Sequence, residues 1–124
     1  MINLILLYAG AALPLVWGVA HLFPTKNVVA GFGDITLDNK RIITMEWINE
    51  AAALIFISAI VFAVTLIEHT STVSQAVYWL SFVVLNTFSV ISLLTAFKIN
   101  FLPYKLCPVL FTTSSILILL GMLL

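Results

Sequence analysis

The chain has 124 residues, of which 63% are hydrophobic and only 8% are charged, and its mean hydropathy is +1.22. A soluble domain carries about 25% charged residues, so this composition excludes a water-soluble globular protein and indicates an integral membrane protein. The formal net charge is zero, which argues against a nucleic acid as a partner.

Four stretches are apolar and long enough to cross a bilayer, which takes about 20 residues: 2–23, 47–67, 75–97 and 106–124. They lack the alternation of apolar and polar residues that is typical of membrane β-strands. Because a helix satisfies its own backbone hydrogen bonds, we predict an all-α fold, a single antiparallel four-helix membrane bundle. No Lys or Arg precedes the first apolar stretch, so we predict a retained helix and not a signal peptide.

One stripe of the first helix combines small, aromatic and polar residues at helical spacing: Asn3, Gly10, Pro14, Trp17, Gly18 and His21. Small residues in a membrane helix let a neighbouring backbone approach closely, so this stripe is predicted to be buried. Pro14 removes a backbone donor in the middle of the helix. His21 is expected at the end of the stripe, near one membrane surface.

The connection over residues 24–45 is the longest in the chain and is apolar for a linker. Its Gly31-Phe32-Gly33 segment predicts a turn. Asp38 is predicted to cap the second helix, which then begins at about Asn39 and extends beyond the hydrocarbon. We expect this first connection to lie on the membrane interface or to fold back under the bundle.

The third helix is predicted to bury a face of mostly small residues: Tyr78, Ser81, Leu85, Ser89, Ser92 and Ala96. Asn86 lies beside this face near the middle of the helix, where an asparagine bonds a neighbouring helix or contacts a ligand. In the fourth helix Pro108 is predicted to occupy the first turn. The hydroxyls of residues 112–115 are expected at mid-membrane, bonded to helix carbonyls.

Lysine and arginine residues are distributed on one side only. Lys26, Lys40 and Arg41 lie in the first connection and Lys98 and Lys105 in the third, whereas the second connection and both chain ends hold none. In a four-span protein the first and third connections share one side of the membrane. The positive-inside rule therefore predicts a multi-pass inner-membrane protein with that side cytoplasmic and both termini outside.

Glu50 carries the clearest sequence indication of function. It lies about one turn inside the second span, where a carboxylate is costly and usually faces the protein interior or a wet cavity. His21 is expected at the same depth, where its imidazole can donate to Glu50 or to Glu46. A ligand-binding or proton-handling role and a purely structural role both stay open for these residues.

Further candidate ligand-binding residues are expected near this level, namely Trp17, Trp47, Asn49 and Tyr104, with Asn86 deeper in the cavity. Lys98, Asn100 and Cys107 are expected at the same level. Trp47 and Tyr104 are equally typical of the aromatic belt at a membrane surface. No HxxH, HxxxH or CxxC motif occurs, so we predict no metal site, and no catalytic residues are identified. No cofactor-binding motif is recognisable either.

Two segments carry a family resemblance: Gly18-Val19-Ala20-His21-Leu22-Phe23, followed by a proline, and Glu46-Trp47-Ile48-Asn49-Glu50. In these segments and in its four-helix layout the chain resembles the DoxX-like families of small bacterial membrane proteins. The resemblance implies an association with membrane-bound oxidoreductase systems, including a quinone-reducing one. Small multidrug resistance transporters also have four spans, but their essential glutamate lies in the first helix, where this chain has no acid.

These observations favour a small inner-membrane protein that binds an apolar or amphipathic molecule, such as a quinone or a lipid, in a cytoplasm-side pocket. Such a protein would be an accessory subunit of a membrane oxidoreductase and not a catalyst on its own. One alternative is a proton-coupled transporter that acts as a homodimer through Glu50. Another is a purely structural subunit of a membrane complex. The expected partners are the lipid bilayer and either further copies of the chain or other membrane subunits.

Overall fold

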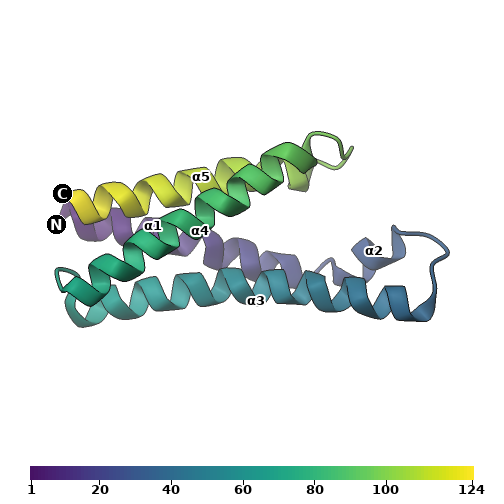
Figure 1. Cartoon of the computed structure of the whole chain (residues 1–124), viewed down its shortest axis with the longest axis horizontal. Coiled ribbons are helices and arrows are strands. Elements are labelled where there is room, and N and C mark those ends of the chain that lie inside the picture. Colours follow the sequence, from purple (N-terminus) through teal and green to yellow (C-terminus); the bar gives the residue numbers. More distant parts are fainter.

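The computed structural model describes all 124 residues, which form five helices and no strand. They are α1 (Ile2–Leu22), α2 (Thr25–Ala30), α3 (Leu37–Glu68), α4 (Thr72–Ala96) and α5 (Leu102–Leu123) (Figure 1). All of them except α2 are long and apolar enough to cross a membrane. The prediction of an all-α four-helix bundle is confirmed, and the chain is a multi-pass membrane protein.

The four long helices run antiparallel in chain order. α1 packs against both α3 and α5, and α4 packs along α5. Figure 1 shows both termini at one end of the bundle and α2 with the α4–α5 connection at the other. From its turn with α3, α4 crosses toward α5, so the contact between α3 and α4 is much less extensive than that of the other neighbouring pairs.

Small residues bring the backbones of α1 and its neighbours together, as the stripe in the first helix predicted. A Cβ atom on Gly18 would lie only 2.9 Å from the carbonyl oxygen of Ala51 in α3. A Cβ atom on Gly121 in α5 would lie 2.9 Å from the carbonyl oxygen of Asn3. Such spacing leaves no room for a side chain, so these glycines set how closely the helices approach.

Hydroxyl groups connect the helices inside this apolar core. Ser114 in α5 donates a hydrogen bond to the carbonyl of Gly10 in α1. The hydroxyls of Ser89 in α4 and Thr112 in α5 lie 2.6 Å apart. Residues 113–115 all donate to helix carbonyls, as predicted, whereas the Thr112 hydroxyl pairs with that of Ser89 and not with a carbonyl.

The predicted buried face of α4 is largely confirmed. Five of its six residues are buried, namely Tyr78, Ser81, Leu85, Ser89 and Ala96. The sixth, Ser92, is half-buried. The outward surfaces of the long helices carry exposed leucine, isoleucine and valine side chains. In a bilayer these side chains contact lipid.

The predicted cap of the second long helix is wrong. Thr36 caps α3, and its hydroxyl accepts a hydrogen bond from the backbone N–H of Asn39 at 3.2 Å. Asp38 lies inside the first turn, with a carboxylate oxygen 3.6 Å from the guanidinium of Arg41. Threonine and aspartate are both good capping residues, so local sequence alone does not decide between two of them so close together.

The predicted start of the last helix is also wrong. α5 begins at Leu102 with Pro103 in its first turn, so Pro108 lies within the helix. Either proline suits a first turn, since neither has a backbone N–H to leave unpaired. The earlier proline is used, which lengthens the helix by about one turn.

The first connection contains α2, a helix of six residues that the sequence analysis did not predict. After α2 the chain turns through Gly31-Phe32-Gly33, and Gly33 adopts a positive φ of 71°. This confirms the predicted turn. α2 packs against α3, so the connection folds back onto the bundle.

Candidate functional site

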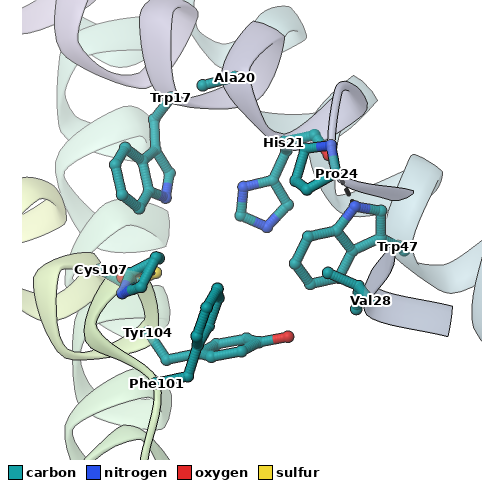
Figure 2. Close-up of a pocket in the computed structure, with 10 residues that line it drawn as sticks. Trp17, Ala20, His21, Pro24, Val28, Trp47, Phe101, Tyr104 and Cys107 are labelled. Carbon is teal, nitrogen blue, oxygen red and sulfur yellow. Dashed lines mark hydrogen bonds between the residues drawn. The ribbon is translucent and has the colours of Figure 1, made fainter. Parts of the chain in front are cut away.

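The end of the bundle that carries α2 is hollowed between α1, α2, α3 and α5. A cavity of about 270 Å³, here named the histidine pocket, opens between these elements (Figure 2). Aromatic and polar side chains from α1, from α3 and from the start of α5 with its preceding residue supply much of its lining: Trp17, His21, Trp47, Phe101, Tyr104 and Cys107. Ala20, Pro24, Val28 and Pro103 complete it. The pocket is therefore mostly apolar.

His21 is held in this pocket by Trp47. The imidazole and indole rings stack with centroids 4.2 Å apart and planes 20° apart, and His21 is only 7% exposed. The indole N–H of Trp47 also donates to the backbone carbonyl of His21 at 2.7 Å, as Figure 2 shows. That carbonyl lies in the last turn of α1, where it has no donor within its own helix. Trp47 thus fixes both the ring and the end of α1.

Two buried nitrogens of this pocket have no hydrogen-bond partner. They are the indole Nε1 of Trp17 and the imidazole Nε2 of His21. Figure 2 shows the indole nitrogen of Trp17 turned toward the imidazole side of the pocket. A buried polar group without a partner costs about 1–3 kcal/mol. The chain therefore leaves two buried polar groups beside the pocket without a hydrogen-bond partner.

Glu50 meets His21, as the sequence analysis predicted, but it does not turn into the protein. Its Oε2 atom lies 3.6 Å from Nε2 of His21, too far for a hydrogen bond. The side chain of Glu50 is 44% exposed, against 8% for that of His21. The carboxylate lies beside the face of α3 that packs against α1, whereas the next residue, Ala51, is buried in that face.

Glu50 lines a second cavity of about 520 Å³, here named the acidic hollow. Glu46 and Asn49 also line the acidic hollow and not the histidine pocket, and both are exposed. Trp47 and Tyr104 line both cavities, together with Val28 of α2. The sequence-predicted residues therefore divide between two adjoining spaces.

Tyr104 packs at the centre of this end of the bundle. Its ring lies edge-on to Trp47, with centroids 6.0 Å apart, and it also contacts the ring of Phe101 at 5.6 Å. A third cavity of about 670 Å³, between α2 and the α4–α5 connection, shares Tyr104 and Val28 with the other two. Tyr104 and Val28 thus border all three spaces.

Asn86 is the predicted site residue that the structure places elsewhere. Its amide nitrogen donates to the carbonyl of Phe82 in the same helix at 2.8 Å. It lines a separate depression on α4, because α4 crosses away from α3 and the histidine pocket. The expectation that Asn86 lies deeper in the cavity is therefore wrong.

Several lining residues were not predicted from the sequence to belong to the site. Cys107 follows Tyr104 by three residues in α5, and this helical spacing is a signal that could have identified it. Phe101 precedes the same helix, and its ring packs against that of Tyr104 at an angle of 59°. Val28 carried no such signal, because the position of α2 depends on its packing against α3.

The site can hold a compact polar group among apolar walls, with a carboxylate beside its histidine. Those properties suit the head of an amphipathic molecule better than a fully polar substrate. No protein-family model matches the sequence, and neither a curated protein nor a solved structure is significantly similar to it.

Proposed function

We propose that this chain binds the head of an amphipathic, quinone-like or lipid-like molecule in the histidine pocket. The observation that supports this is the pair of buried nitrogens, Nε1 of Trp17 and Nε2 of His21, which have no partner in a mostly apolar cavity. A carbonyl oxygen of a quinone or an ester accepts hydrogen bonds and offers no charge to desolvate. Such a head fits both the donors and the walls.

The dimensions of the pocket favour a compact head. Ligand pockets commonly enclose about 300–1,000 Å³, and this one encloses about 270 Å³. A single aromatic or quinone ring suits this space between the rings of Trp17, Trp47 and Tyr104. A bulky sugar or nucleotide head does not.

Glu50 would act on the ligand through His21. A carboxylate 3.6 Å from Nε2 favours the tautomer that carries its proton there, and so keeps His21 a hydrogen-bond donor. Glu50 itself stays half-exposed and lines the neighbouring hollow. In this proposal the chain holds the molecule for a redox partner, as the DoxX-like resemblance implies, and is not a catalyst alone.

Equilibrium binding of a radiolabelled benzoquinone to the purified chain in nanodiscs tests this function. Trp17→Phe keeps the aromatic wall but removes one donor, and should weaken binding about tenfold, equivalent to about 1.4 kcal/mol. Trp79→Phe is the matched control, because Trp79 lies on the outer surface of α4. Competition with a diacylglycerol distinguishes a lipid head from a quinone. The proposal fails if the wild-type chain binds neither molecule saturably, or if both variants lose affinity equally.

A second function, a proton-coupled transporter acting as a homodimer, is favoured by the exposure of Glu50. A half-exposed carboxylate at membrane depth can exchange protons with a cavity such as the acidic hollow. Uptake of a cationic dye into proteoliposomes under a proton gradient tests it. Glu50→Gln should abolish the uptake. If the wild-type chain itself shows no uptake, the transporter function is wrong, and the binding function and a purely structural role in a complex are the remaining hypotheses.

The proposed site faces the cytoplasm of a cell inner membrane. All five Lys and Arg residues lie in or beside the two connections at the α2 end, which supports this orientation. Asp34→Cys and Thr70→Cys, each in a Cys107→Ser background, place thiols at opposite ends of the bundle. An impermeant maleimide added outside the cell should label position 70 and not position 34. The reverse pattern would overturn the orientation.

A further inference from the structure

The bundle is open between α3 and α4 beyond the turn that joins them. The hydrogen bonds between these two helices all lie near that turn, where Thr65 bonds Tyr78 at 2.9 Å and Ser74 bonds carbonyls of α3. Farther along, α4 crosses toward α5 (Figure 1). A space of about 490 Å³ remains there, here named the lateral groove.

The lateral groove adjoins the acidic hollow of the candidate site. It shares Ala53 and Phe88 with the acidic hollow, which in turn shares Trp47 and Tyr104 with the histidine pocket. Along α3 the track from Trp47 to Ile60 measures about 20 Å, at 1.5 Å per residue. These shared side chains place the three spaces next to one another, in series from the membrane surface into its hydrocarbon.

We propose that the lateral groove holds the long prenyl or acyl tail of the molecule whose head occupies the histidine pocket. This inference rests on the proposed function and narrows its ligand class to tailed molecules that enter sideways from the bilayer. Except for the hydroxyls of Ser81 and Thr87, the groove is lined by apolar side chains, which match a hydrocarbon tail.

Two features of the groove favour an occupant that is not a helix of this chain. Ala53 and Ser81 are small, so they leave the space open where larger residues would fill it. The hydroxyls of Ser89 and Ser114 bond neighbouring helices, but that of Ser81 has no partner. The hydrogen bonds between α3 and α4 thus end near their turn, whereas α4 and α5 stay bonded through Ser89 and Thr112 farther along.

Photocrosslinking tests the position of the tail directly. A benzoquinone with a diazirine at the end of a long alkyl tail is bound in nanodiscs, irradiated, and its attachment mapped by mass spectrometry. Labelling should concentrate on residues 53–60 and 80–88 and should be displaced by excess unlabelled quinone. Position is a sharper readout than affinity here, because a tail leaving the bilayer gains no hydrophobic free energy.

Variants that fill the groove give the second readout. Ser81→Trp and Thr87→Trp should each reduce labelling of the groove at least fivefold while leaving the binding of a tail-less benzoquinone unchanged. Leu94→Trp, on the exposed surface of α4 outside the groove, is the matched control and should change neither. Thr87 is exposed, so its replacement keeps the test available if Ser81→Trp fails to fold.

The outcomes separate the two proposals. If the tail-less quinone does not bind the wild-type chain, the proposed function itself fails. If it binds but the label spreads over all lipid-facing residues, only the tail site is overturned. If a second copy of the chain covers the groove instead, residues 53–60 and 80–88 will stay unlabelled, and that result would also overturn the tail site.

Discussion

A serine of α5 supplies a hydrogen bond that a proline removes from α1. Pro14 has no backbone N–H, so the carbonyl of Gly10, four residues earlier, lacks its normal helical donor. Ser114 donates to that carbonyl with an oxygen–oxygen distance of 2.6 Å, and it is fully buried. Glycine makes this approach possible, because a Cβ on Gly10 would lie 3.1 Å from the Ser114 carbonyl oxygen.

Ser114→Ala should therefore destabilise the bundle by about 1–2 kcal/mol. Hydrogen bonds between membrane helices contribute about 0.6 kcal/mol on average and about 1.7 at most. The upper part of this range applies because the variant leaves the Gly10 carbonyl without a donor in hydrocarbon. Pro14→Ala restores a donor within α1, so in that background Ser114→Ala should cost at most about 0.5 kcal/mol.

The four proteins of this double-mutant cycle can be compared by SDS titration in mixed micelles, with helicity followed by circular dichroism. Pro14 is buried, so Pro14→Ala also removes packing, but that loss occurs in both arms and cancels. Ser115→Ala is the matched control, since the Ser115 hydroxyl bonds the Thr112 carbonyl of its own helix. If Ser114→Ala lowers the free energy of unfolding equally in the wild-type and in the Pro14→Ala background, the Ser114 hydroxyl does not replace the backbone donor that Pro14 lacks.

Two other hydrogen bonds give predictions of the same kind. Trp47→Phe keeps a ring on the imidazole but removes the donor to the His21 carbonyl, so backbone amides at the end of α1 should exchange with deuterium about five- to tenfold faster. Unchanged exchange would show that this bond does not hold the helix end. Thr65→Val leaves the buried Tyr78 hydroxyl without a partner and should cost about 1–2 kcal/mol in the SDS titration. Thr87→Val, at an exposed threonine bonded only within its own helix, should cost almost nothing, and an equal loss in both variants would contradict this reasoning.

The four long helices could be predicted from the sequence because hydrocarbon admits few backbone conformations. A chain with so few charged residues must bury its backbone polar groups, and a helix does so without a partner. The buried stripes of α1 and α4 were also predictable, since small residues at helical spacing have one strong use in a membrane, which is close helix packing.

Features outside the hydrocarbon were harder to predict, because water satisfies several alternatives there. Thr36 and Asp38 are both able to cap α3, and only the observed geometry distinguishes them. The helix α2 has six residues and no side-chain cap, so its position depends on packing against α3 and not on its own sequence.

The depth of the site residues followed from helix lengths, but their rotation about the helix axes did not. Trp47 and Glu50 are three residues apart and share one side of α3. Trp47 nevertheless covers His21, while the Glu50 carboxylate stays half-exposed. That difference depends on which face of α3 packs against α1, and hydropathy alone does not identify that face.

The close approach of Gly18 to Ala51 determines which face of α3 packs against α1, and thereby builds the site. In an antiparallel pair, moving three residues on from Gly18 reaches His21, and moving four residues back from Ala51 reaches Trp47. These steps are about 4.5 and 6 Å along the two axes, so the contact between the glycine and the carbonyl places the imidazole on the indole. The packing stripe of α1 and the candidate binding residues are consequently one feature of the sequence, because the small residue that joins the helices also sets the register of the ring stack.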